Sequence, residues 1–167
     1  MKEKIVLFLT GTFGAITGKI IGVFIISMIP IIELRGAIPV AFAIGLDWKI
    51  AMVVSIIGNL LPIPFILLFL DFLFNFMKKH NILKRLVLWS EEKAHKNAPK
   101  VEKYGFLGLM IFTAIPLPGT GAWTGALIAS VMKMNRKKSI VSIILGVLIA
   151  STVVTIITYG LIGSIIS

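Results

Sequence analysis

The feature that most constrains this chain is its C-terminal stretch, 139–167, which carries no formal side-chain charge. A helix of ~20 predominantly apolar residues is long enough to cross the ~30 Å hydrocarbon core of a bilayer. A second stretch, 50–77, is also apolar and contains one charged side chain, Asp71. Charged residues make up 14% of the chain, against roughly 25% in water-soluble domains. We therefore predict one all-α integral membrane domain over 1–167, with transmembrane helices at 50–77 and 139–165.

The net charge of +10 indicates membrane topology rather than nucleic-acid binding. The basic residues cluster in 78–103 and in 133–138, and both clusters flank long apolar segments. Such flanking charge is what the positive-inside rule produces, and it also attracts anionic lipid headgroups. Apolar residues at helical spacing within 78–103 predict an amphipathic helix on the membrane interface. We expect membrane lipids as partners, no nucleic acid, and a multi-pass location in the cytoplasmic membrane of the cell.

The first interrupted apolar stretch is 20–46. The thirteen uncharged residues before Glu33 would make a helix of only ~20 Å, well short of the hydrocarbon core. Glu33, Arg35, Gly36 and Pro39 follow, and then a second short apolar run. Non-helical backbone at membrane depth is tolerated only against protein or a wet cavity. We predict a re-entrant helical hairpin over 20–46, broken at these four residues.

The second interrupted stretch, 104–132, is long enough to cross a membrane. Its middle contains Pro116, Pro118, Gly119 and Gly121, which remove backbone donors and weaken a helix. If this stretch turns back, both basic clusters lie on one side of the membrane, as the positive-inside rule prefers. A second re-entrant hairpin is therefore expected over 104–132.

These elements predict an internal repeat, because a hairpin followed by a span occurs in 1–77 and again in 104–167. The Gly-Ala pairs at Gly36 and Gly121 match at an offset of 85 residues. One true crossing per repeat inverts the second copy relative to the first, so that the two hairpin tips meet near the midplane. Inverted repeats with broken helices are a recurring architecture of secondary transporters.

The two breaks carry the features of an anion site. Half-helix N-termini near Gly36 and Gly121 would present unsatisfied N–H groups and a partial positive charge. Gly119 lets the backbone approach a ligand closely. The guanidinium of Arg35 has a fork geometry suited to phosphate or carboxylate. The sequence thus predicts a site for a phosphate-like headgroup.

The sequence leaves two roles open for Glu33. A carboxylate inside a membrane is a functional candidate, often as a proton carrier, or it forms an ion pair with Arg35 that holds the hairpin in shape. The other candidate substrate-binding residues line the same two breaks; they are Pro39, Pro116, Pro118, Thr120, Trp123 and Thr124. Asn59 and Asp71 are secondary candidates within the first span.

Several kinds of chemistry are not expected. The chain has no cysteine, and its two histidines lack metal-ligand spacing, so we predict neither a metal site nor a cofactor. No nucleophile–base pairing is recognisable, which argues against an enzyme. Two complete spans are few to enclose a pathway, and the glycines of the N-terminal segment permit close helix packing, so we predict a homodimer. These glycines are Gly11, Gly14, Gly18 and Gly22.

Two motifs, ELRGAIP at 33–39 and PLPGTGAWTG at 116–125, resemble the small multi-drug export protein family over essentially the whole chain. The chain is more distantly similar to the DedA or SNARE-associated superfamily. That resemblance implies re-entrant hairpins in inverted repeats and movement of lipids, undecaprenyl phosphate among them. DedA motifs pair an acidic residue in the first hairpin with arginines around a Pro-Gly in the second. Glu33 and the Pro-Gly at 118–119 match this scheme, but the second hairpin has no arginine.

Three hypotheses follow. The first is a carrier for an amphiphilic anion, such as undecaprenyl phosphate or a phospholipid, coupled to protons through Glu33. The second is a proton-coupled exporter of lipophilic cations, in which drug and proton compete for Glu33; the adjacent Arg35 argues against it. The third is a membrane scaffold that transports nothing.

Overall fold

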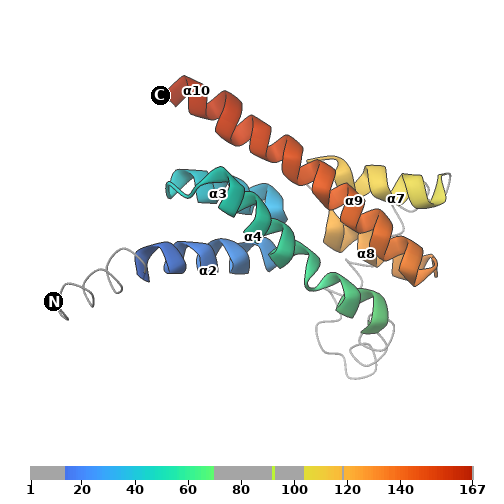
Figure 1. The fold of residues 1–167 in the computed structure, drawn as a ribbon. Helices are drawn as coiled ribbons and strands as arrows, with labels where there is room; N and C mark the ends of the chain where they lie inside the picture. Colours follow the sequence, from blue (N-terminus) through green and yellow to red (C-terminus); the bar gives the residue numbers. More distant parts are fainter. Residues whose placement is uncertain (1–13, 70–91, 93–103, 118, 167) are drawn as a thin grey trace. The chain divides into compact units, whose positions relative to one another are not determined.

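The computed structural model describes residues 14–69, 92, 104–117 and 119–166, and this part of the chain is helical with no strand (Figure 1). The predicted all-α class is therefore confirmed. The chain divides into two compact units, one formed by Met1–Gly58 with Ser151–Ser167 and the other by Asn59–Ala150. Each unit is described by itself.

The described residues contain two helices long and apolar enough to cross a membrane, and both overlap the predicted spans. The first includes α4 (Trp48–Leu60), continues after a turn at Leu61 and Pro62, and extends to Phe69. Its 22 residues correspond to ~33 Å. The predicted remainder of this span, including Asp71, lies outside the described residues, as does nearly all of the predicted interfacial segment 78–103.

The second long helix runs from Arg136 to Ile165, and its 30 residues correspond to ~45 Å. It consists of α9 (Arg136–Thr155), a π-helical stretch η2 (Ile156–Ile162) and α10 (Gly163–Ile166). The wider π-helical turns are rare and often occur near functional sites.

The pattern of burial in these helices suits a lipid environment. Large apolar side chains such as Val53, Ile57 and Phe65 are more than half exposed. Buried positions include hydroxyl side chains such as Ser142 and Ser151, each with 0% exposure. Water-soluble domains show the reverse preference and rarely expose continuous apolar surface.

Hairpin one consists of α2 (Gly14–Met28) and α3 (Glu33–Ala43), which pack against each other through Val23, Ala37 and Ala41 (Figure 1). These three side chains have 0% exposure. The small alanines on α3 allow the close approach of α2. Within the described residues α2 has 15 residues and α3 has 11, fewer than the ~20 that a complete crossing requires.

The break of hairpin one is earlier than predicted. It lies at 29–32, where Ile29 O accepts hydrogen bonds from Ile32 N and Glu33 N, whereas Gly36 and Pro39 lie inside α3. Pro30 explains the position, because a proline disfavours the helical conformation of the residue before it. Gly36 has a packing role instead, since a Cβ at this position would collide with the side chain of Ile32.

The C-terminal end of α3 is fixed by side chains from both ends of its unit. Lys19 Nζ donates to Ile44 O at 2.5 Å, and Tyr159 Oη donates to Leu46 O at 2.8 Å. The ring of Tyr159 also meets Phe42 edge to face, with ring centroids 5.1 Å apart. The π-helical stretch therefore holds hairpin one at its end.

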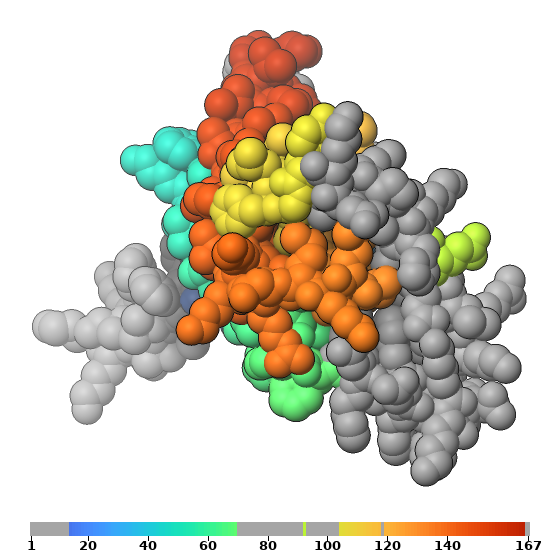
Figure 2. Space-filling view, turned by 90° about the vertical axis from the view of Figure 1, so that its right-hand side faces the viewer, coloured from blue at the N-terminus to red at the C-terminus, as the bar shows by residue number. Residues whose placement is uncertain are grey.

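Hairpin two consists of α7 (Gly105–Ala114) and α8 (Ala122–Val131), with a break at 115–121 that contains the prolines and glycines of the sequence motif. It packs against α9, where Ser142 Oγ donates to Phe106 O at 2.6 Å, and Figure 2 shows α7 in yellow beside the orange start of α9. Leu109, Ile128 and Ile143 form the buried centre of this packing, each with 0% exposure.

The two hairpins end in the same motif. After α3, Gly45 N donates to Phe42 O and Leu46 N donates to Ala41 O; after α8, Lys133 N and Met134 N make the equivalent bonds, all at 2.9–3.0 Å. This is the Schellman arrangement, in which the residue after the helix takes a left-handed conformation. Gly45 has a φ of 70° and Lys133 a φ of 51°.

The following helices also begin and pack alike. The side chains of Asp47 and Asn135 accept bonds from backbone N–H groups at the start of α4 and α9. Farther along, Gly58 and Gly146 each lie against a backbone carbonyl of the preceding hairpin. Both pairs are 88 residues apart. The offset of 85 residues in the sequence match is thus out of register by three, because it aligns a residue inside α3 with one that precedes α8.

Candidate functional site

The predicted charged pair lies in the first turn of α3. An Arg35 guanidinium nitrogen donates to a carboxylate oxygen of Glu33, and the two side chains form a salt bridge. The side chain of Glu33 is 3% exposed and that of Arg35 is 14% exposed. Both side chains are therefore largely removed from water, and each charge faces the opposite charge of the other.

The backbone at Glu33 is itself unusual. Its φ is 52°, a left-handed conformation that side chains other than glycine rarely adopt. The turn imposes this conformation, because Glu33 N must reach Ile29 O at 2.9 Å while the chain reverses direction. Strained residues of this kind cluster at functional sites. The strain places the carboxylate of Glu33 at the start of α3, within reach of Arg35.

Hairpin two carries its predicted site residues in a loop that is held together by its own backbone. Thr120 Oγ1 donates to Ile115 O at 2.7 Å or to Leu117 O at 2.8 Å. Gly119 and Gly121 have φ values of 88° and 132°, which only glycine adopts readily. The hydroxyl of Thr120 therefore supports the shape of the break.

The other candidates of hairpin two lie around the start of α8. Thr124 is 5% exposed, Trp123 is half-buried, and Pro116 is exposed. Pro118 lies outside the described residues. As predicted, α8 begins directly after Gly121. Gly125 comes close to α7, since a Cβ at this position would lie 2.8 Å from Thr113 Oγ1.

Asn59 is the secondary candidate that the structure describes, and it is completely buried with 0% exposure. Neither its amide nitrogen nor its amide oxygen has a hydrogen-bond partner among the described residues, and the hydroxyl of Ser55 one turn earlier on α4 lacks one as well. Buried polar atoms normally have partners, and exceptions call for an explanation such as a bound molecule. Ser55 belongs to no recognisable sequence motif, and only its burial in the structure identifies it as a candidate.

The structure thus brings Glu33 and Arg35 into direct contact and gathers Thr120, Gly121 and Thr124 at the break of hairpin two. The meeting of the two hairpin tips stays a prediction. In the described ranges, no three His, Asp or Glu side chains converge into a group that could hold a metal ion.

Comparison with known proteins gives one family. The family model described as "Putative small multi-drug export protein" matches residues 33–153, nearly three quarters of the chain. The matched region begins at Glu33 and contains both sequence motifs. No curated protein and no solved structure matches the chain.

Proposed function

This chain belongs to the putative small multi-drug export protein family, and from that premise we propose that it is a transporter for an amphiphilic anion. The family is one of export proteins, so a membrane transporter is the general class. The substrate we propose is a lipid phosphate, such as undecaprenyl phosphate or a phospholipid. The observation that carries this proposal is the buried pair of Glu33 and Arg35 at the strained start of α3.

The pair suits exchange between a proton and an anion. While Glu33 is ionised, it occupies the guanidinium of Arg35 and leaves the site neutral overall. When a proton neutralises Glu33, the guanidinium of Arg35 loses the negative charge that it faces in the salt bridge, and an anionic headgroup can replace that charge. The planar fork of Arg35 binds phosphate oxygens in pairs. Anion binding would therefore be coupled to protonation of Glu33.

The proposed architecture is an inverted repeat of re-entrant hairpins. Its support is the pair of short helices in each hairpin, the shared Schellman ends and the glycine contacts repeated at 88 residues. Each repeat contributes one crossing, which inverts the second copy relative to the first. The buried amide of Asn59, which has no hydrogen-bond partner among the described residues, is a further candidate for contact with the substrate.

We propose that the working form is a homodimer. Gly18 and Gly22 on α2 have open space where a Cβ would be, so a second copy could approach this face closely. Cross-linking in native membranes would test this association.

The test is transport in reconstituted vesicles. Glu33→Gln and Arg35→Gln should each abolish translocation of a short-chain fluorescent lipid phosphate, because one removes the proton acceptor and the other the anion partner. The double variant removes both charges without leaving either uncompensated, and it provides a folded but inactive control. Lys137→Gln, an exposed charge on α9, should transport at the wild-type rate. Wild-type rates from both single variants would overturn the proposal.

A second candidate, export of lipophilic cations, is favoured by the family description. Here Glu33 would bind either a drug or a proton. A cationic drug would have to displace Arg35 from the carboxylate, which makes this reading the weaker one. Drug-dependent proton release from the purified protein, lost in Glu33→Gln, would support it, and absence of drug binding would exclude it.

A further inference from the structure

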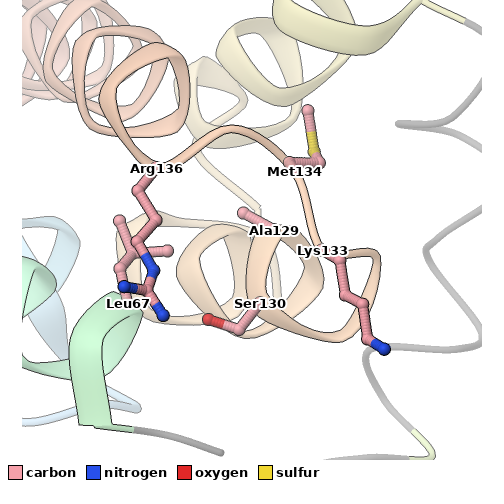
Figure 3. Close-up of a pocket in the computed structure, with 6 residues that line it drawn as sticks. All are labelled: Leu67, Ala129, Ser130, Lys133, Met134 and Arg136. Carbon is pink, nitrogen blue, oxygen red and sulfur yellow. The ribbon is translucent and has the colours of Figure 1, made fainter.

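A second feature of the molecule lies away from the charged pair of hairpin one. A cavity of about 280 Å³ opens where α8 ends and α9 begins. Its described lining consists of Leu67, Ala129, Ser130, Lys133, Met134 and Arg136 (Figure 3). All six residues belong to one compact unit, so the cavity is a property of that unit alone.

The polar side of this cavity is cationic. Lys133 and Arg136 are exposed at its edge, and none of the six described lining residues is acidic. In Figure 3 the hydroxyl of Ser130 is turned toward the guanidinium of Arg136, while Lys133 extends from the loop that follows α8. Two cations without a carboxylate among the described lining residues favour an anionic ligand.

Ser130 adds an independent observation. Its Oγ is buried and has no hydrogen-bond partner among the described residues, although a buried hydroxyl normally has one. A phosphate oxygen in the cavity would accept a hydrogen bond from this hydroxyl. A phosphate oxygen is thus both the acceptor that Ser130 Oγ lacks and a group that Arg136 attracts.

The backbone at Lys133 supports a functional reading. The equivalent position after α3 is glycine, which adopts a positive φ without strain, whereas Lys133 has a φ of 51°. A lysine at this position is less favourable for the turn than a glycine would be. Strain retained at one residue commonly serves a function. Here it places a positive charge at the mouth of the cavity.

The remaining walls and the volume narrow the class of ligand. Leu67, Ala129 and Met134 supply the apolar part of the described lining. Pockets for drug-sized ligands occupy roughly 300–1,000 Å³, and this cavity falls just below that range. It can therefore accept a headgroup and the first carbons of its chains. The basic cluster at 133–138 indicates that this end faces the cytoplasm, where anionic lipids gather.

We propose that this cavity binds the phosphate headgroup of an anionic membrane lipid. Arg136 holds the phosphate oxygens in a paired arrangement, Ser130 donates one hydrogen bond, and Lys133 adds charge from the rim. The acyl chains leave along Leu67 and Met134. The site involves neither Glu33 nor Arg35 and does not depend on the transport proposal.

The experiment is calorimetric titration of the purified full-length protein in a neutral maltoside detergent. The probes are dihexanoyl phosphatidic acid, dihexanoyl phosphatidylcholine with the same chains, and inorganic phosphate. Phosphatidic acid should bind about tenfold more tightly than either of the other two. Equal affinity for inorganic phosphate would overturn the assignment to a lipid, and equal affinity for phosphatidylcholine would overturn the role of headgroup charge.

Matched variants test the individual residues. Arg136→Gln should weaken binding of phosphatidic acid about tenfold, and Lys133→Gln and Ser130→Ala should weaken it about three- to fivefold. Lys137→Gln removes a neighbouring exposed charge that does not line the cavity, so its affinity should stay within about twofold of wild type. Circular dichroism would check that each variant is folded. Equal losses in Arg136→Gln and Lys137→Gln would reduce the effect to diffuse surface charge and overturn the proposal.

Discussion

Hairpin one and hairpin two end with the same pair of hydrogen bonds, and the helix after each one begins with a polar capping side chain, Asp47 or Asn135. The second helix within each hairpin, however, begins differently. In the first turn of α3, Glu33 and Arg35 form a buried ion pair. The first four residues of α8, 122–125, carry no charge at all. The shared ends are explained by packing, because each hairpin must meet the span that follows it. The different starts agree with the proposed function, which places the anion site in hairpin one.

The difference also shows how each break is stabilised. In hairpin one the carboxylate and guanidinium compensate each other, and one residue accepts a strained backbone. Hairpin two uses Gly119 and Gly121 for its turn, and the hydroxyl of Thr120 donates to Ile115 O or to Leu117 O. The first arrangement can change with protonation, whereas the second cannot. Of the two breaks, the one in hairpin one is therefore expected to respond to protonation.

The largest effect should come from dividing the ion pair. Arg35→Gln removes the guanidinium that faces the buried carboxylate of Glu33, and breaking a buried pair in this way costs about 3–5 kcal/mol of folding free energy. The double variant with Glu33→Gln should recover most of that loss. Equilibrium unfolding in mixed micelles would measure both values. If the double variant were as unstable as Arg35→Gln, the two side chains would not act as a pair.

The shared packing can be tested in both hairpins at once. A Cβ at Gly58 would lie 2.7 Å from Phe24 O, and a Cβ at Gly146 would lie 2.7 Å from Met110 O. Because backbone cannot yield easily, Gly58→Ala and Gly146→Ala should each cost about 1–3 kcal/mol of folding free energy, as overpacking typically does.

The control for this pair is Gly18→Ala, measured on the detergent-solubilised monomer, in which a Cβ at this position meets nothing within 4 Å. This substitution should stabilise α2 by roughly 0.5–1 kcal/mol, since alanine favours helix over glycine. Thermal unfolding in detergent gives all three values. Comparable losses at Gly58 and Gly146 would support equivalent packing, and a loss at only one of them would argue against it.

The sequence predicted the parts of the molecule that local chemistry determines. Apolar length predicted both long helices, and the prolines and glycines of 116–121 predicted the second break. The first break lies earlier than the charges of Glu33 and Arg35 indicate, because Pro30 rather than the charged pair interrupts the helix. The basic cavity could not be predicted, since Leu67 and Arg136 are far apart in the chain and only folding brings them to one wall.

The smallest effect is expected at the residue that follows each hairpin with a positive φ. This residue is Gly45 after hairpin one and Lys133 after hairpin two. Lys133→Gly should relieve the left-handed strain and stabilise the protein by about 1 kcal/mol, while Gly45→Lys should destabilise it by a similar amount. Open space around Gly45 means that only the backbone contributes there. Unfolding temperatures in detergent would measure both changes.

The same substitution separates stability from binding at this position. If Lys133 is present for its charge, Lys133→Gly should gain stability and lose affinity for phosphatidic acid, because the strain and the ligand contact reside in one residue. Lys133→Gln keeps the strain and removes only the charge, so it should lose affinity without gaining stability. A gain of stability with unchanged affinity in Lys133→Gly would mean that the lysine serves no ligand. The two hairpin ends would then differ without functional consequence.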